Sequence, residues 1–246
     1  MLLYTVTDAK RYRKHRRKTE KDMNSFKIEN GILIKYLGGM GRDVTVPDGV
    51  TEIVKSAFGE NQYIRKLRIP GSVKSIGDEA FLFCGELKCV HASKGLESIG
   101  RGAFARCSRL TETEIPVGVT SIGEEAFYLC SALKSITVPF GVKCIEKKTF
   151  TGCYSLTDAT VMHGVEKISS EAFMGCRRLK KIDLPGSLTL IEAGAFGMCL
   201  ALKKVVFRGT TEEWKRIAYD GIFKDASAAV TVLCNDGDVA YKKNKT

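Results

Sequence analysis

The sequence predicts a solenoid, a stack of about seven coils of 23 residues each, with short parallel β-strands and a cap at both ends. The first observation is a phenylalanine that recurs every 23 residues without a slip, at Phe58, Phe81, Phe104, Phe127, Phe150, Phe173 and Phe196. The second is that an isoleucine five residues before it, and a leucine or isoleucine six residues after it, keep the same phase. Self-similarity at a fixed period of this length is typical of repeat proteins whose neighbouring coils share one core.

The first 24 residues are predicted to be a basic tail outside the stack. The chain has a net charge of +11, and residues 1–24 contain eight basic and three acidic side chains. The basic run is densest at Lys10, Arg11, Arg13, Lys14, Arg16, Arg17 and Lys18. We expect a disordered, solubilising extension; the alternative is a segment that binds nucleic acid or an anionic membrane by charge. The start of the chain lacks the order of a secretory signal, and no transmembrane segment is predicted.

Residues 25–43 are predicted to form a β-hairpin that caps the N-terminal end of the core. Apolar residues alternate in two short runs, 26–28 and 32–34, with Asn30-Gly31 between them. An Asn-Gly pair between alternating runs is a strong signal for a tight hairpin turn. Such a cap is needed because the end coil of a solenoid would otherwise expose its core to water.

Residues 44–207 are predicted to form the solenoid itself, and residues 119–139 illustrate one coil. Residues 135–138 alternate between polar and apolar side chains, which predicts a short strand, and Pro139 ends it because proline cannot donate to a strand ladder. A second extended segment runs to Gly123, which we expect to permit a tight bend. Residues 124–127 then predict a helical turn that leads into the buried phenylalanine.

Six of the nine cysteines form a column of their own, three residues after a phenylalanine, at Cys84, Cys107, Cys130, Cys153, Cys176 and Cys199. We expect these side chains to face the interior as small apolar groups in a tight groove. Disulfides between neighbouring coils would be strained for most pairs, and no Cys-x-x-Cys pair predicts zinc. Cys89, Cys144 and Cys234 lie outside the column, and Cys89 is expected at the surface. Free thiols favour a reducing, cytoplasmic compartment.

Residues 208–241 are predicted to cap the C-terminal end with a short helix and a hairpin. The sequence from Thr210 to Glu213 fits a capping box, so we expect a helix to begin there and to place Trp214 over the last coil. Two extended runs, 230–233 and 239–241, flank an Asp-Gly pair typical of a turn. Residues 242–246 add a second, shorter basic tail.

The coil can be written V-x-x-I-G-x-x-A-F-x-x-C-x-x-L, followed by a strand that ends in I-P. This pattern resembles the BspA-like leucine-rich repeat family of bacterial type over residues 44–207. The flanking sequences F-x-I-E-N-G-x-L and G-T-x-x-E-W are similar to the ends of bacterial members. The resemblance implies a right-handed, leucine-rich-repeat-like coil stack, protein binding or adhesion, and a cell-surface or secreted location. Departures from the pattern, including Thr113 and Ala159 at core positions, predict irregular coils around Phe104 and Phe150.

We find no constellation that predicts an enzyme, and we expect no catalytic residue, cofactor, metal site or small-molecule substrate. Cys89 and His91 are the nearest approach to a Cys-His nucleophile, but two residues on one strand face are ordinary neighbours. His15 falls in the basic tail and His163 in a turn. The glycines of residues 38–41 lack the Lys-Ser/Thr ending and the following helix of a phosphate loop.

The turn after the phenylalanine column carries large apolar side chains where other coils have glycine. These side chains are Leu82, Phe83, Tyr128, Leu129, Met174 and Met198. They are either a ridge that contacts a protein partner or groups that tuck against the adjacent coil. The outward strand positions mix charges and carry no aromatic side chain, unlike a nucleic-acid platform. The sequence thus favours a non-catalytic protein-binding or adhesion module, with nucleic-acid or anionic-membrane binding through the tail as the alternative.

Overall fold

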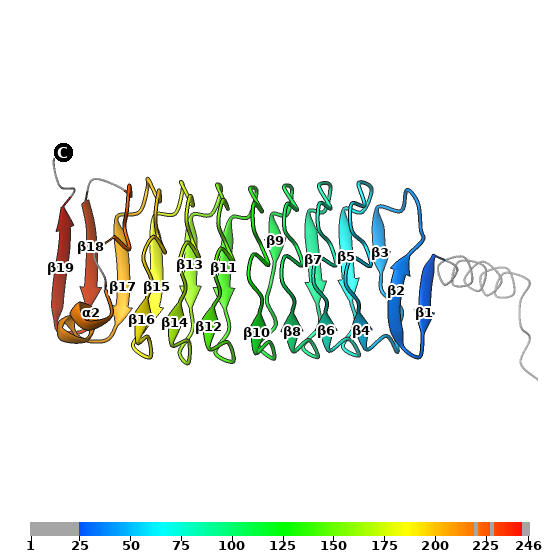
Figure 1. Cartoon of the computed structure of the whole chain (residues 1–246), viewed down its shortest axis with the longest axis horizontal. Coiled ribbons are helices and arrows are strands. Elements are labelled where there is room, and N and C mark those ends of the chain that lie inside the picture. Colours follow the sequence, from blue (N-terminus) through cyan, green and yellow to red (C-terminus); the bar gives the residue numbers. More distant parts are fainter. Residues whose placement is uncertain (1–24, 219–220, 227–228, 243–246) are drawn as a thin grey trace, which may run out of the picture.

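The computed structural model describes residues 25–218, 221–226 and 229–242, which form a β-solenoid of about nine turns (Figure 1). Its coils stack along one axis, and helix α2 (Thr211–Ile217) lies beside the last of them. The predicted fold class is confirmed. The turns outnumber the seven phenylalanines of the column because the segments at both ends continue the stack.

The longer strands form two sheets along the solenoid. The first contains β3 (Asp43–Thr45), β5 (Lys66–Ile69), β7 (Cys89–Ala92) and β9 (Glu112–Thr113). The second contains β11 (Ser135–Val138), β13 (Asp158–Val161), β15 (Lys181–Pro185), β17 (Lys204–Arg208), β18 (Ala229–Cys234) and β19 (Gly237–Lys242). Parallel pairing joins residues 23 positions apart, such as Ile136 and Ala159.

The shorter strands form two further sheets. One contains β1 (Phe26–Glu29), β2 (Ile32–Tyr36), β4 (Glu52–Ile53), β6 (Ser75–Ile76), β8 (Ser98–Ile99) and β10 (Ser121–Ile122). The other contains β12 (Cys144–Ile145), β14 (Lys167–Ile168) and β16 (Leu190–Ile191). Each two-residue strand buries its isoleucine, so the isoleucine column lines the core on this side.

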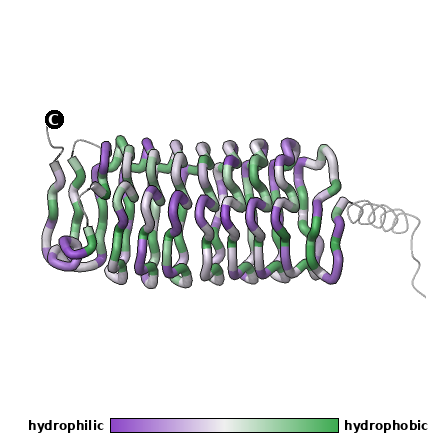
Figure 2. The backbone as a smooth tube through the Cα atoms, in the orientation of Figure 1, coloured by the Kyte–Doolittle hydropathy of each residue, from purple (hydrophilic) through white to green (hydrophobic). Residues whose placement is uncertain are grey.

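Alternation along the longer strands separates the core from the solvent. In β11, Ile136 and Val138 are buried, whereas Ser135 and Thr137 are exposed. Hydrophobic and hydrophilic stretches accordingly alternate along the coils (Figure 2). Because side chains in a strand alternate between its two faces, and coils pair in register, each apolar column becomes a continuous wall of the core.

The phenylalanine column is a stack of buried rings. All seven phenylalanines are at most 2% exposed, and neighbouring rings lie with their centroids 4.7–5.6 Å apart. Tyr36 extends the stack onto Phe58 at 5.1 Å, and Phe223 extends it beyond Phe196 at 5.8 Å. The stack therefore contains nine rings, which agrees with the number of turns.

The cysteine column faces the interior as predicted, and its thiols are free. Each thiol donates a hydrogen bond to the carbonyl of a phenylalanine in the preceding coil, as Cys130 does to Phe104 at 3.2 Å. Burial raises the pKa of Cys153 to about 12, so this side chain stays a neutral thiol. The cysteine thus fills a small apolar site and also satisfies a buried carbonyl.

The turn of each coil is built differently from the sequence prediction. Gly123 does not have a left-handed backbone; instead, a Cβ atom there would lie 2.5 Å from the backbone nitrogen of Arg101. The glycine is required by close approach of the preceding coil, and left-handed backbone occurs at Glu125 (φ 59°) and Leu129 (φ 56°). Residues 124–127, predicted as a helical turn, form hydrogen-bonded turns and no helix.

At the N-terminal end, β1 and β2 form an antiparallel hairpin. Its turn contains Asn30 (φ 50°) and Gly31 (φ 76°), as expected for an Asn-Gly hairpin. Strand β2 then pairs in parallel with β4 and joins the hairpin to the first regular coil. The sheets run without a gap from hairpin to coil, and the division at residue 44 stays a prediction.

At the C-terminal end, the predicted capping box is present. The Thr210 hydroxyl accepts from the Glu213 backbone, and the Glu213 carboxylate accepts from the Thr210 backbone. Trp214 is fully buried against Phe207, and its indole Nε1 donates to the Tyr241 hydroxyl at 2.9 Å. Strands β18 and β19 form the expected antiparallel hairpin, with β18 paired to β17. The division at residue 208 stays a prediction.

The strand ladders are interrupted between residues 112–122 and residues 135–145, which stand 23 positions later in the repeat. In the described part of the chain, β9 does not pair with β11, and β10 does not pair with β12. The turn ladder continues through this region, where the Phe104 N–H donates to the Ala126 carbonyl at 2.8 Å and the Phe127 N–H donates to the Thr149 carbonyl at 2.9 Å. The irregular coil predicted around Phe104 is therefore found. Near Phe150 an irregularity is also found, because the short strand β12 does not pair with β10, whereas β13 pairs regularly on both sides and accommodates Ala159 as a small core residue.

Candidate functional site

The turn that follows each buried phenylalanine forms a surface that runs along the stack. Backbone hydrogen bonds join these turns from coil to coil, as from Phe83 N–H to the Ala105 carbonyl (2.9 Å) and from Leu129 N–H to the Thr151 carbonyl (2.8 Å). We call this surface the corner ridge, formed by Leu82, Phe83, Arg106, Tyr128, Leu129, Tyr154, Met174, Arg177 and Met198. Its backbone is fixed by the coil stack, so its side chains have a regular spacing along the molecule.

The six apolar residues predicted as contacts are placed unequally on the corner ridge. Phe83 is exposed, with 42% of its surface accessible, and the other five are half-buried. Leu129 leans over Gly152, where its Cδ2 atom occupies the space that a Cβ atom would need. For Leu129 the structure therefore matches the alternative interpretation, in which the side chain tucks against the next coil. Contact of any of the six with a partner stays a prediction.

Arginines lie against the aromatic rings of the corner ridge. The Arg106 guanidinium lies 5.1 Å from the ring centroid of Phe83, one coil before it, and 5.9 Å from that of Tyr128, one coil after it. Arg177 lies in the same way 5.3 Å from the ring of Tyr154. Sequence reasoning missed Arg106, Tyr154 and Arg177. The sequence pattern that could have identified them is an arginine in one coil and an aromatic residue at nearly the same repeat position in a neighbouring coil.

In the part of the chain that the structure describes, Arg106 and Arg177 form no ion pair, in contrast to some other arginines of the solenoid. Arg109 and Arg65 share the Glu86 carboxylate, at 2.7 and 3.6 Å. Within residues 25–218, 221–226 and 229–242, no carboxylate lies within ion-pair distance of Arg106 or Arg177. The corner ridge thus combines exposed apolar area with positive charge that this part of the molecule does not neutralise.

A second exposed apolar group lies at the turn after the longer strands. Val117, Phe140 and Met162 are 52%, 56% and 38% exposed. They occupy consecutive coils at or next to the position that follows the strand-ending proline. We call them the strand-end cluster, and sequence reasoning missed it although Phe140 stands in a column with Gly71, Lys94, His163 and Gly186.

The predicted neighbours Cys89 and His91 do touch, with the Cys89 sulfur 3.0 Å from His91 Nε2. Cys89 is 7% exposed, so its expected surface position is wrong. Burial and, next, the Glu112 carboxylate raise the pKa of this thiol, which disfavours the thiolate that a nucleophile needs. The hollow of about 310 Å³ beside the pair opens where β9 and β11 separate.

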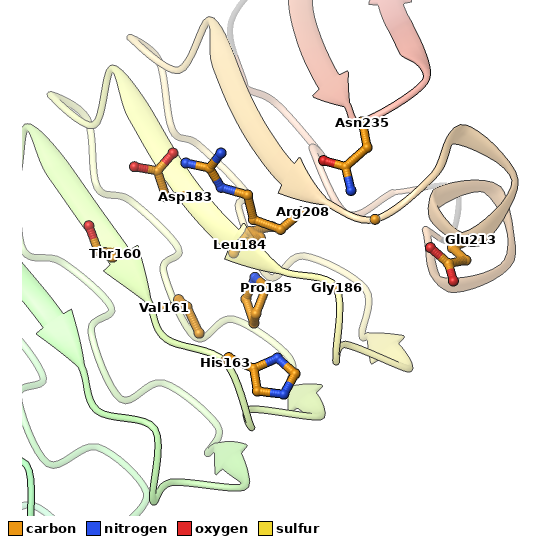
Figure 3. Close-up of a pocket in the computed structure, with 11 residues that line it drawn as sticks. Thr160, Val161, His163, Asp183, Leu184, Pro185, Gly186, Arg208, Glu213 and Asn235 are labelled. Carbon is orange, nitrogen blue, oxygen red and sulfur yellow. The ribbon is translucent and has the colours of Figure 1, made fainter.

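A larger hollow, of about 460 Å³, lies between the last coils and the C-terminal cap (Figure 3). Its lining includes His163, Asp183, Arg208, Glu213 and Asn235. Glu213 is held in the capping box, and Asp183 Oδ2 pairs with Lys181 at 2.9 Å. These contacts give the two acidic groups structural roles.

Metal binding, the basic segment and membrane spanning are the remaining features of the sequence analysis. Within the described ranges, no group of three or more His, Cys, Asp or Glu side chains has the geometry of a metal site. The basic residues of the proposed anion-binding segment, 10–18, fall outside the described ranges. The described helix is too short to cross a membrane.

Comparisons with known proteins agree with this architecture. A leucine-rich repeat protein from T. pallidum has a solved structure that is similar with a TM-score of 0.68 and 27% identity, covering 80% of this chain and 91% of that one. A leucine-rich repeat protein from Bacteroides ovatus is similar with a TM-score of 0.62 and 24% identity, covering 79% and 55%. Comparison with curated proteins found no match. Six copies of the BspA type leucine rich repeat region match residues 41–120 and 97–224. The chain therefore belongs to the BspA-type leucine-rich repeat family.

Proposed function

We propose that this chain is a non-catalytic protein-binding module and that the corner ridge is its contact surface. The observation that carries the proposal is Arg106 stacked between Phe83 and Tyr128 on an exposed corner. Tyrosine and arginine are enriched among the residues that dominate binding energy at protein interfaces. Leucine-rich repeats of this kind commonly mediate protein interaction and are generally non-catalytic scaffolds, which supports the class of function.

Adhesion at the cell surface is the proposed setting. Proteins of the BspA-type family are often located there. The free thiols do not oppose this setting, because the six column cysteines are buried and burial suppresses the reactive thiolate. A cytoplasmic setting remains the alternative that the thiols favour, and cell fractionation with an antibody to the chain separates the two.

Substitution of two ridge rings tests the contact surface. We expect Phe83→Ser with Tyr128→Ser to weaken binding to an immobilised extracellular-matrix protein by about 10-fold or more, because truncated hot-spot aromatics lose that much affinity. The measurement is surface plasmon resonance of the full chain against a panel of purified matrix proteins. The matched control is Phe140→Ser in the strand-end cluster, which removes a ring that is 56% exposed. Equal losses in both variants, or no loss in the ridge variant, would contradict the proposal.

The basic tail supports a second candidate function, because seven of the nine residues 10–18 are lysine or arginine. We propose that this segment can hold anionic polymers or an anionic membrane near the solenoid. Deletion of residues 1–24 should then abolish retention on heparin and on vesicles with anionic lipid. Retention by the full chain should fall steeply between low and high salt, because the contacts are mainly ionic. Retention that survives either change would refute this function.

A further inference from the structure

We propose that the corner ridge recognises an acidic segment of its protein partner, whose carboxylates pair with Arg106 and Arg177 while its apolar side chains rest on the rings. This inference rests on the proposed function and adds the chemical class of the ligand. The stacked rings of the phenylalanine column take no part in this recognition, because they lie inside the core.

The aromatic contacts hold the two arginines in a conformation suited to carboxylates. A guanidinium that lies over a ring uses its flat face, and its N–H groups point outward from its edge. Those N–H groups match the two oxygens of a carboxylate and can donate to both at once. Arg106 is further positioned because its own backbone N–H donates to the Tyr128 carbonyl at 2.7 Å. Less side-chain freedom is therefore lost when a carboxylate binds.

The arginines of the corner ridge differ from the cations that form ion pairs between coils. Several exposed cations pair with a glutamate in an adjacent coil, as Arg101 does with Glu79, Lys74 with Glu97 and Lys143 with Glu166. Arg106 and Arg177 lack such a partner within the described ranges, and so does the adjacent Arg178. A ligand with negative charge would supply the missing counterpart on this surface.

The spacing of the two arginines determines how far apart the acidic residues of the ligand must be. Arg106 and Arg177 belong to coils that are three apart, so along the solenoid axis they are separated by about 15 Å at the usual spacing of neighbouring strands. An extended peptide advances about 3.3 Å per residue, so its acidic residues would be four or five positions apart. Tyr128 and Tyr154 lie in the two coils between them, where the intervening apolar side chains of the ligand would rest.

The same spacing favours a peptide over a single-stranded nucleic acid. A nucleic-acid backbone carries a charge at every nucleotide and is tracked by a continuous basic groove. The ridge positions of the two intervening coils hold Tyr128, Leu129, Gly152 and Tyr154, none of which is basic. Two isolated arginines separated by apolar side chains match a ligand with alternating acidic and apolar residues.

The experiment measures binding of the full chain to a fluorescein-labelled peptide of 12 residues, with glutamates four positions apart among Leu, Ala and Ser. The probe is compared with the same peptide containing glutamine and with a 12-nucleotide oligothymidine. We expect Arg106→Gln with Arg177→Gln to weaken binding of the glutamate peptide by about 10-fold, because two charge-assisted contacts are lost. The glutamine peptide should bind weakly to both forms of the protein.

The matched control is Arg101→Gln with Arg109→Gln. These arginines are 54% and 55% exposed, each has a glutamate partner, and their removal changes the net charge by the same amount. We expect this control to change affinity by less than about 2-fold, because its charges are already balanced. The basic tail is present in every variant, so its contribution cancels from the comparison.

Each other outcome overturns the inference. Equal losses in the two arginine pairs would reduce the effect to net charge, and equal binding of the glutamine peptide would remove the role of carboxylates. Loss of oligothymidine binding alone in the Arg106 and Arg177 variant would assign the site to nucleic acid.

If the ring variant Phe83→Ser with Tyr128→Ser loses matrix-protein binding but the Arg106 and Arg177 variant keeps it, the inference fails while the proposed function stands. If neither variant loses it, the proposed function fails as well.

Discussion

Phe127→Ala is expected to destabilise the fold by about 3–5 kcal/mol, the usual range for removing a buried phenylalanine side chain. Phe127 is 1% exposed, and its ring lies between those of Phe104 and Phe150 at 5.4 and 5.5 Å. The turn ladder holds the coils on both sides in register, so they cannot move together and fill the cavity. The measurement is the midpoint of urea-induced unfolding, followed by circular dichroism.

Phe140→Ala is the control for this prediction. It deletes the same atoms from a ring that is 56% exposed, so we expect a change within about 0.5 kcal/mol. A Phe127 variant that unfolds at the same urea concentration as the Phe140 variant would show that the ring stack does not hold the coils together.

Trp214→Ala is expected to have an effect of similar size, about 3–5 kcal/mol, on the C-terminal end of the chain. Trp214 is fully buried, packs on Phe207 and donates to the Tyr241 hydroxyl. Because each coil of a solenoid contacts only its neighbours, we expect the loss to remain near the cap. Hydrogen exchange followed by mass spectrometry should show faster exchange in β17 and β18 and unchanged exchange in β5 and β7.

Trp214→Phe separates packing from hydrogen bonding. It keeps an aromatic ring against Phe207 but removes the indole donor, so we expect a smaller loss of about 1–2 kcal/mol. Faster exchange along the whole chain in the alanine variant would mean that the solenoid unfolds as one unit and would contradict the local role of the cap.

The fold could be predicted because the repeat presents the same physical requirement many times. The phenylalanines and the column cysteines recur at fixed positions, and their side chains are buried. The capping box between Thr210 and Glu213 is a local pattern of four residues. Such features depend on periodicity or on near neighbours in sequence. They could be read without knowing how distant segments approach one another.

The sequence predictions were wrong at positions whose surroundings depend on how closely neighbouring coils approach one another. Gly123 was assigned to a bend, but it is the backbone of Arg101 in the preceding coil that leaves no room for a side chain. Cys89 was placed at the surface because its strand position faces outward, yet it is only 7% exposed and its sulfur lies 3.0 Å from His91 Nε2. Ala159 was expected to disturb its coil, and the core accommodates it without loss of pairing.

The candidate site was predicted only in its apolar part. Phe83 and Tyr128 stood out because they replace small residues in their columns, whereas Arg106 was not singled out. Its significance depends on a position between two rings from different coils, which a linear sequence does not display. Reading each surface column together with its neighbours would have exposed this pattern.

The interrupted ladders give the molecule an uneven bending stiffness. Two faces lack strand pairing between residues 112–122 and residues 135–145, while the turn side keeps its hydrogen bonds, including those from Arg106 to Tyr128 and from Leu129 to Thr151. Under a bending load the rod would therefore flex at this boundary, with the paired side as its pivot and the unpaired faces opening. The corner ridge lies along the pivot, so the distance between its two arginines would change least as the rod bends. A ligand held there would stay bound while the rest of the molecule yields to the load.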